Sequence, residues 1–385
     1  MSLLFSRNTK VYIEKDSRIW EVPVLDGFSF SQGTNNTEVT LNEAVDTNGK
    51  SKRSRKLFND SYAPAEWSLS TYIRPFASVP GATDGWQASG NNADIHAVEE
   101  VLWACLVSKP TFTPSVASTS DASWSKGIVN ETGAMTIGFK DSEVPDLGTF
   151  NLYFESPTTG GGLKRYKLTG CCVNEASVDF DIDGIATINW SGFSKTLEDD
   201  GGSALAGTYI KEKIADTNNF IRNRLTSMTL SSSISGANLS YQAVLTGGNI
   251  TFTNNLTFLT PETIGKINQP TAHVVGTRSI SGSFSCYLDS GSVSAGQGNV
   301  ADLFEDIIDA NQVITNSFDM DISIGGSGTG NKVEVSLPRC HLEIPTHSID
   351  DVISLEVNFH ALSDGLDPTD GGNNDSMEAK LVYKV

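Results

Sequence analysis

Polar and apolar residues alternate strictly in two stretches of the chain. In "ASVDFDIDGIATINWSGF" (176–193), Val178, Phe180 and Ile182 alternate with polar residues, and the alternation resumes after the Asp183-Gly184 turn. A period of two is typical of a strand with one buried face. We therefore predict a hairpin here, with one apolar and one polar face. "ISLEVNFHAL" (353–362) is predicted to be a strand of the same kind.

Two other stretches have the apolar spacing of an amphipathic helix. They are "DIHAVEEVLWACLV" (94–107) and "NVADLFEDIIDAN" (299–311), in which apolar residues recur three and four positions apart. Asp94 and Asn299 precede the apolar runs and are predicted to be the N-caps, because their short side chains can accept a hydrogen bond from the first helical turn.

The order of predicted elements recurs in the two halves of the chain. A strand, a glycine-rich turn, a strand and a cysteine occur at 149–172 and again at 317–340. Two further strands precede each helix, at 26–44 and 65–75 in the first half and at 247–262 and 278–289 in the second. We infer an internal duplication.

The predicted fold class is mainly β (α+β), with two tandem domains at 1–200 and 221–385 joined by a linker at 201–220. Each domain is expected to be an antiparallel β-sandwich or partial barrel with one flanking helix. Such a sheet can close around an axis when neighbouring copies pair with its edges, so we expect closure into a ring by oligomerisation.

The first half carries two additions. Residues 108–134 are rich in serine, threonine and proline and are predicted to be a loop insertion. A hairpin arm at about 43–65 carries a basic cluster within seven positions, whereas the second half has Lys266 at the equivalent place. The cluster consists of Lys50, Lys52, Arg53, Arg55 and Lys56.

Composition limits the class of protein. The 385 residues, 38% of them hydrophobic, are enough for two soluble domains. The net charge of −19 argues against ordinary nucleic-acid binding, which needs positive charge. The five cysteines have neither disulfide-scaffold nor zinc-site spacing, and we expect them to be reduced and mostly buried. The N-terminal apolar run is too short for a leader or a membrane span.

No catalytic constellation is evident, so we predict that the chain is not an enzyme and needs no cofactor or metal. The five histidines include no H-E-x-x-H motif, and Cys340 and His341 are adjacent on a predicted strand, where their side chains point to opposite faces. "GGSGTGN" (325–331) lacks the Gly-Lys-Ser/Thr ending of a phosphate loop and is predicted to be a hairpin turn.

Several longer phrases resemble the major tail tube proteins of long-tailed siphophages, in the subgroup whose tube domain is duplicated. They are "LLFSRNTKVYI", "TLNEA", "KLFNDSYAPAEWSLSTYIRP", "GTYIKEKI", "NLTFLTPETIG" and "RCHLEIPTHSIDDVISLEV". The resemblance implies a structural virion protein that forms stacked homotrimeric, pseudo-hexameric rings, which are the conduit for genome ejection. Some members carry a C-terminal immunoglobulin-like domain, which this chain is expected to lack.

The resemblance also implies partners and a location. The expected partners are other copies of the chain, the tape-measure protein, and the tail-tip and tail-terminator proteins. Double-stranded DNA is expected to pass through without specific binding, and no membrane is involved. The implied location is the virion tail, assembled in the host bacterial cytoplasm.

A second interpretation comes from the residues without the resemblance. Two β-rich domains also suit a binding module or adhesin of the virion, because binding sites are not revealed by a fold. In that case Trp67, Trp86 or Trp124 would be exposed and would stack on sugars.

Two sets of charged residues are predicted to serve the tube. Asp179, Asp181 and Asp183 share the polar face of their hairpin, and with Glu356 they are expected to face the bore and to repel DNA. The alternative is an ordinary solvated sheet face.

The basic arm is expected to dock on the acidic surface of the next ring, where opposite charge sets the stacking register. The alternative is a solvated loop. Basic runs often bind DNA, but without the five bases the chain has a net charge of −24, from 22 basic and 46 acidic residues. DNA binding is therefore disfavoured.

Overall fold

The computed structural model of the chain describes most residues, with gaps at the loops. The described residues are 4–39, 47–49, 56–77, 94–107, 127–131, 133–140, 147–158, 160–201, 205, 208–210, 219–232, 240–265, 267–294, 296–308, 318–326, 328–349, 352–362 and 377–385.

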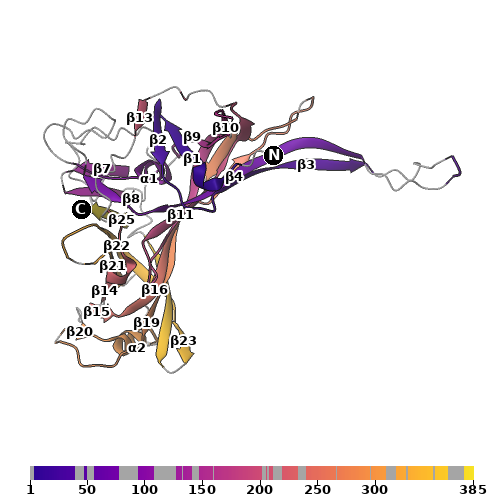
Figure 1. Cartoon of the computed structure of the whole chain (residues 1–385). Helices are drawn as coiled ribbons and strands as arrows, with labels where there is room; N and C mark the ends of the chain where they lie inside the picture. The colour runs from indigo at the N-terminus through magenta and orange to yellow at the C-terminus, as the bar shows by residue number, and fades with distance from the viewer. Residues whose placement is uncertain are drawn as a thin grey trace, which may run out of the picture.

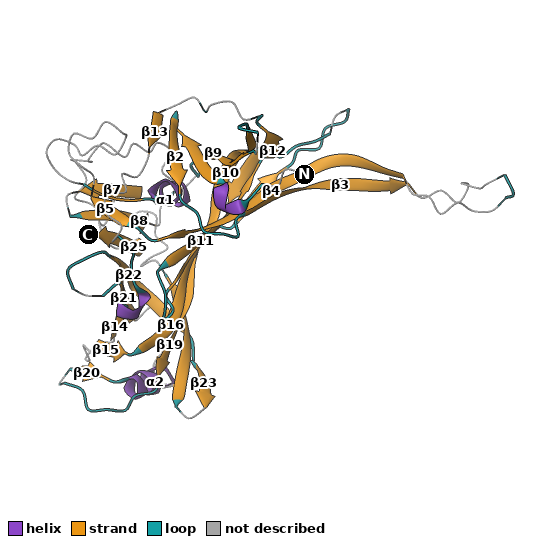
Figure 2. Cartoon of the chain, viewed as in Figure 1, coloured by secondary structure: helices purple, strands orange, loops and turns teal. Residues whose placement is uncertain are grey.

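A long antiparallel sheet runs through the centre of the molecule (Figures 1 and 2). Its pairing order is β3-β4-β11-β10-β16-β19-β24. These strands are β3 (Ser29–Val39), β4 (Lys56–Tyr72), β10 (Leu163–Asp179), β11 (Thr187–Ser194), β16 (Leu245–Thr253), β19 (Ser279–Tyr287) and β24 (Ile353–Ala361). Beyond β24, the two halves of that strand pair with β22 (Lys332–Leu342) and β23 (Thr346–Ile349).

The N-terminal half of β10 leaves the central sheet and belongs to a second sheet. The order there is β12-β10-β9-β1-β2-β13, with only the β2–β13 pair parallel. The added strands are β1 (Lys10–Lys15), β2 (Arg18–Val22), β9 (Phe150–Pro157), β12 (Thr196–Asp199) and β13 (Thr208–Ile210). β13 therefore lies within the stretch that the sequence predicts to be a linker.

The N-terminal half of β22 forms a third sheet in the same way. The order is β25-β22-β21-β14-β15-β20, again with a parallel pair at the end. The added strands are β14 (Ser227–Ser232), β15 (Ser240–Ala243), β20 (Gln297–Gly298), β21 (Phe318–Ile324) and β25 (Met377–Lys384).

A hairpin from the first half of the chain extends the third sheet. It consists of β7 (Gly127–Glu131) and β8 (Ala134–Lys140), and β8 pairs with β25. Gly127–Glu131 is thus a strand, although the sequence predicts a loop there. The reason is that β7 pairs with β8, and β8 in turn pairs with β25, which lies far away in the sequence.

The first five strands of the second and third sheets follow the same order along the chain, and the two sheets have the same register at their centres; the parallel end strands differ, because β13 follows β12 whereas β20 precedes β21. Cys171 lies opposite Phe150 across β9–β10, and Cys340 lies opposite Phe318 across β21–β22. The pairings among the described strands branch but form no closed circuit, so the sheets are open. The predicted mainly β fold class is confirmed, and the structure shows that the sheets are open.

The two α-helices of the described chain are α1 (Glu100–Leu106) and α2 (Val300–Ile308), and neither is long and apolar enough to span a membrane. Short 3-10 helices lie at Ser6–Asn8 and Asn223–Leu225. Asn299 caps α2 as predicted: its Oδ1 accepts a hydrogen bond from the Asp302 amide (2.8 Å), and the Asp302 carboxylate accepts one from the Asn299 amide (2.9 Å).

Asp94 does not cap α1, and that prediction is wrong. Residues Ile95–Ala97 form strand β6, which pairs with β5 (Pro75–Ala77), so the helix begins only at Glu100. Helical spacing of apolar residues cannot exclude a short strand pair, because the partner strand lies about twenty residues earlier in the chain.

One hydrophobic core extends under both halves. Trp103 of α1 contacts the rings of Trp190 from β11, Phe139 from β8 and Phe252 from β16. Because these rings come from both halves, their packing joins the two predicted domains.

A buried polar chain links α1 to the last strand. Trp103 Nε1 donates a hydrogen bond to the Tyr383 hydroxyl (2.7 Å), which donates to Glu99 Oε1 (3.0 Å). Burial raises the pKa of Glu99 to about 8, opposed by a backbone hydrogen bond, by the hydrogen bond from Tyr383 and by the charge of Arg74.

Candidate functional site

One face of the central sheet is polar from strand to strand. A row of cross-strand neighbours runs over six strands and consists of Ser70, Asn189, Ser177, Thr251, Ser281 and His360. The alternate positions carry buried side chains such as Trp190, Phe252 and Phe284. The sheet is therefore amphipathic, with its core on one side and a face of short, mostly neutral polar groups on the other.

Asp179 and Glu356 both lie on this polar face. Asp179 lies between Thr187 and Asn249 and accepts a hydrogen bond from Asn189 Nδ2 (2.6 Å). Burial and the nearby Asp181 carboxylate raise the pKa of Asp179. Glu356 is exposed on β24 opposite Ser285.

Asp181 and Asp183 do not continue the strand, so the prediction that they share its face is wrong. β10 ends at Asp179, and both residues are exposed in the turn that follows. Ile182, predicted to share the apolar face, is 48% exposed there. The alternation of side chains lasts only as long as the backbone is extended, so the last acids lie at the end of the sheet. Asp183 Oδ1 is 3.7 Å from Arg224 Nη1.

Sequence reasoning missed Glu343 on the same face. Its carboxylate accepts hydrogen bonds from Asn358 Nδ2 (3.0 Å) and pairs with His360 Nε2 (3.1 Å). These two contacts lower the pKa of Glu343. The available signal was its spacing of two from His341, which places both on one side of an extended strand.

The β3–β4 hairpin forms the predicted arm and projects far from the body (Figure 1). The strands reach further than expected, because β4 begins at Lys56. Lys56 Nζ lies 5.3 Å from the ring centroid of Phe58, which is exposed. The other bases of the cluster, Lys50, Lys52, Arg53 and Arg55, lie outside the described residues.

A shorter arm, β17 (Leu256–Leu259) with β18 (Ala272–Val275), meets the long arm at its base. The Tyr62 amide donates to the Asn268 carbonyl (2.9 Å), and the Asn268 amide donates to the Asp60 carbonyl (3.2 Å). Asn268 Oδ1 also accepts a hydrogen bond from the Thr263 amide (2.9 Å). The junction therefore fixes the base of the long arm.

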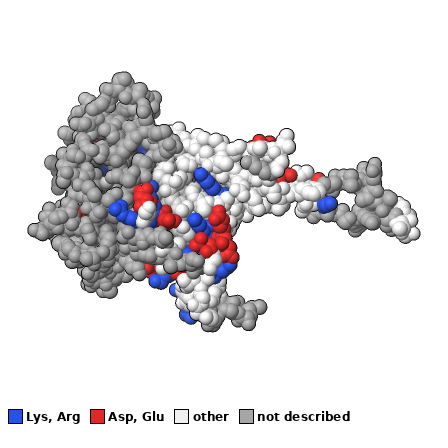
Figure 3. Space-filling view, turned by 90° about the horizontal axis from the view of Figure 1, so that it is seen from above, with Lys and Arg blue, Asp and Glu red and all other residues white. Residues whose placement is uncertain are grey.

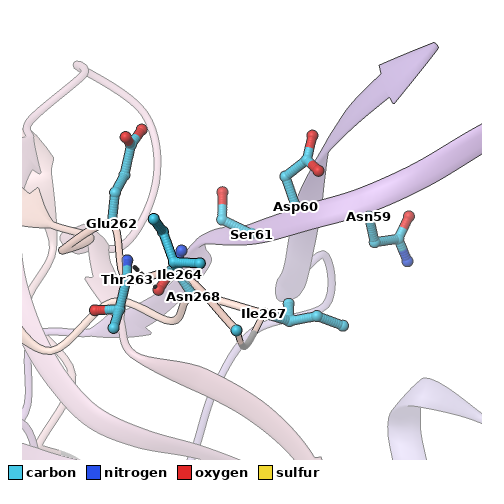
Figure 4. A pocket seen from close by; sticks show the side chains of 9 residues that line it. Asn59, Asp60, Ser61, Glu262, Thr263, Ile264, Ile267 and Asn268 are labelled. Atoms are coloured by element: carbon cyan, nitrogen blue, oxygen red, sulfur yellow. Dashed lines mark hydrogen bonds between the residues drawn. The ribbon is translucent and has the colours of Figure 1, made fainter. Parts of the chain in front are cut away.

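A hollow of about 800 Å³ lies at this junction (Figure 4). Its lining includes the carboxylates of Asp60 and Glu262 and the fully exposed Ile264. Elsewhere, Figure 3 shows acidic side chains gathered on one area of the body, with basic side chains among them. The chain thus carries acidic groups at positions other than the basic arm.

Inside the chain, the two halves of the central sheet join at the β10–β16 seam. Glu175–Asp179 of β10 lies opposite Asn249–Thr253 of β16. Ala176 faces the core there opposite Phe252, and both are fully buried. At the seam, the two strands therefore pair without interruption, and their core-facing side chains are apolar.

Two outer edges of the central sheet lie open at its ends. Within the described residues, β3 pairs only with β4, and the segment after Leu342 pairs only with β24. Cys340 and Leu342 are buried in β22, and Ile344 lies two residues beyond the end of that strand and is 71% exposed. A large exposed apolar side chain beside an open sheet edge is a candidate contact for a neighbouring copy.

The cysteines and tryptophans test two other interpretations, a thiol or metal site and a sugar-binding module. All five cysteines are free and buried, as predicted, and burial raises the pKa of Cys105 and of Cys172 to about 12. Trp67 is only 2% exposed, which removes it as a sugar-stacking residue; Trp86 and Trp124 lie outside the described residues. Among the residues that the structure describes, no group of three or more His, Cys, Asp or Glu could hold a metal ion.

The family described as phage tail tube protein matches residues 40–361. The chain is also similar to the tail tube protein pb6 of Escherichia phage T5, with 27% identity over 384 residues, which cover 97% of this chain and 75% of the T5 protein.

Proposed function

This chain belongs to the phage tail tube protein family, as a structural siphophage tail protein, and on that premise we propose that three copies join their central sheets edge to edge into a ring. Stacked rings form the tube through which the genome is ejected. The observation that carries this proposal is the β10–β16 seam. There, two edge strands from the two halves of one chain already pair in the way that we propose for neighbouring chains.

The ring seam follows from the internal one. The edge after Leu342 would lie beside β3 of a neighbouring copy, as β10 lies beside β16. Ile344 would then be covered, as Ala176 is covered at the internal seam. Burying a side chain of this size contributes about 1.5–3 kcal/mol, and pairing the strands satisfies backbone groups that water otherwise solvates.

Three chains per ring follow from two equivalent halves. The strand order β3-β4-β11-β10 in the first half matches β16-β19-β24-β22 in the second. We propose that the chain arose by duplication and supplies two of six similar sectors. Closed cyclic symmetry is the common arrangement for such heterologous contacts.

The polar face lines the bore in this proposal. Its short hydroxyl and amide groups offer DNA few charges to bind. Asp179 and Glu356 on this face add repulsion, and Asp181 and Asp183 lie beside it in the turn at the end of the sheet. Duplex DNA carries about one charge per 1.7 Å, and salt screens charges beyond ~8 Å. The acids therefore act only on DNA that passes close to the wall, which lets the genome slide without specific binding.

The basic arm docks on the acidic surface of the next ring. Its five bases oppose the charge of the rest of the chain, so opposite charge steers neighbouring rings and sets their register. Each exposed ion pair contributes only about 0–1 kcal/mol, but three arms per ring act together. The tape-measure protein inside the tube, and the tail-tip and tail-terminator proteins at its ends, complete an assembly formed in the host cytoplasm.

The test is Ile344→Asp, which puts a charge into the ring seam but not into the folded core of one chain. We expect a folded chain that no longer forms rings, measured by circular dichroism, native mass and electron microscopy. Ile264→Asp, at a fully exposed position away from the seam, is the matched control. Rings of six chains, or normal rings from Ile344→Asp, would contradict the proposal, and lone wild-type particles at high concentration would favour a binding module.

A further inference from the structure

β12 and β25 hold the same place in the second and third sheets. β12 pairs with β10 with Leu168 opposite Leu197, and Leu168 lies three residues before Cys171. Leu337 lies three residues before Cys340, and Ser336 beside it is opposite Lys380 of β25. Leu197 of β12 therefore has the position of Ala379 of β25.

The outer edges of these two strands are covered differently. On β25, Ala379 lies opposite Phe139 of β8, so a whole strand covers the edge. On β12, a side chain covers the same positions. Gln32 Oε1 accepts a hydrogen bond from the Leu197 amide (3.0 Å), and Gln32 Nε2 donates to the Lys195 carbonyl (3.1 Å).

The Gln32 amide therefore imitates a strand. An N–H and a C=O two residues apart point the same way from a strand edge, and a carboxamide offers them one acceptor and one donor, as a backbone peptide does. Gln32 Nε2 also donates to the Ala63 carbonyl (3.0 Å), which holds the carboxamide in place.

Gln32 of β3 is polar, whereas the residue at the equivalent position of the second half, Phe252 of β16, is apolar. Gln32 lies opposite Ala65 on β4, and Phe252 lies opposite Ile280 on β19. Ala65 and Ile280 hold equivalent places, opposite Ser194 and Ala361. Phe252 is fully buried in the core, whereas Gln32 is only half-buried and uses its amide on β12.

We propose that Gln32 is a specificity-determining residue that keeps β8 of a second copy from pairing with β12. The third sheet shows that β8 fits this type of edge, and β12 would present the same edge without Gln32. Because assembly concentrates many copies, β8 could then add to β12 of another chain, a heterologous and non-closing contact. With Gln32 in place, each β7–β8 hairpin stays on β25 of its own chain.

The test uses pairs of introduced cysteines. Gly138 lies opposite Lys380, so Gly138→Cys with Lys380→Cys reports the native pairing within one chain. Glu198 of β12 has the position of Lys380, so Gly138→Cys with Glu198→Cys reports the swapped pairing between chains. The native cysteines are buried, which limits their interference.

We expect Gln32→Ala to increase the interchain disulfide of the swapped pair at least several-fold on non-reducing gels. Gln32→Met, which keeps the side-chain length without the hydrogen bonds, should do the same if Gln32→Ala fails to fold. Ser31→Ala, on the adjacent position of β3, is the matched control and should leave the yield unchanged. No increase in a folded Gln32 variant would overturn the inference.

The experiment is run below the concentration at which rings form. The β12 edge and the Gln32 side-chain amide that covers it belong to one chain, so this inference can be tested without rings. It rests on the proposed self-assembly only for the reason why such protection is needed. A chain that never forms rings would contradict the proposed function, yet the disulfide yield would still decide the role of Gln32.

Discussion

The hydroxyl of Tyr383, in the last strand, donates a hydrogen bond of 3.0 Å to Glu99 Oε1 at the start of α1. Both residues are fully buried and lie 284 positions apart in the sequence. The contact ties the C-terminal strand to the helix of the first half. Its strength depends on the protonation of Glu99, which gives the first prediction.

Stability should fall as pH rises through the range in which Glu99 ionises. Burial raises the pKa of Glu99 from 4.5 to about 8, so between these values the folded chain holds a proton that the unfolded chain has lost. Its contribution is full below pH 4.5 and is lost as pH approaches 8, at about 1.4 kcal/mol per pH unit.

Thermal or denaturant unfolding from pH 5 to 8.5 measures this slope. Glu99→Gln, which stays neutral, should flatten the curve, whereas Asp183→Asn, at an exposed acid, should leave it unchanged. Parallel curves for wild type and Glu99→Gln would show that Glu99 is ionised throughout.

Removing the Tyr383 hydroxyl should destabilise the chain without changing its shape. Tyr383→Phe leaves Trp103 Nε1 and Glu99 Oε1 without this buried partner, and an unsatisfied buried group costs about 1–3 kcal/mol. Chemical denaturation measures the loss. Tyr287→Phe, at an exposed residue, is the control, and an equal effect of both variants would contradict the role of the polar chain.

Neutralising the basic arm should weaken the stacking of rings but not their formation. Replacing Lys50, Lys52, Arg53, Arg55 and Lys56 with serine removes the charges that steer one ring onto the next. We expect single rings at salt concentrations where wild type forms tubes, and wild-type tubes that weaken as salt rises.

Light scattering and electron microscopy over a salt series measure this effect. A variant with Lys10 and Lys164 replaced by serine, an exposed and a partly exposed lysine outside the arm, controls for general loss of positive charge. Unchanged polymerisation of the arm variant at every salt concentration would leave the arm as a solvated loop.

Reversing charge on the polar face should make the tube bind DNA. In Asp179→Lys with Glu356→Lys, rings should still form, because both side chains lie away from the core. Assembled tubes should then retain duplex DNA in a salt-dependent manner, measured by co-sedimentation.

Glu305→Lys, at an exposed position of α2 off the central sheet, supplies the control for that experiment. If this control retains as much DNA as the double variant, or if neither retains any, the two acids do not face the bore.

Local patterns predicted most of the elements. The alternation in 176–193 gave the β10–β11 hairpin, and the glycine-rich turns gave the β9–β10 and β21–β22 hairpins. Asn299 identified the start of α2. These features depend on neighbouring residues, whose spacing is visible in the sequence.

The same local reasoning failed where a distant segment decides the structure. Ile95–Ala97 continues a helical pattern but pairs with β5. The composition around Gly127–Glu131 predicts a loop, but these residues form β7. The β7–β8 hairpin pairs with β25, about 240 positions later in the sequence. Neither partner can be identified from periodicity, since hydrogen bonds between strands do not depend on side-chain identity.

By itself, the sequence determined the β-rich class, the hairpins with one polar face, the capped helix α2 and the basic arm. Only the tertiary structure decided which edges meet: β10 with β16, β8 with β25, and Gln32 with β12. It also decided that Glu99 is buried beside Tyr383. The reason is that alternation tells which face of a strand is buried, whereas the choice of neighbour depends on backbone groups that are the same in every strand and on the packing of the whole core.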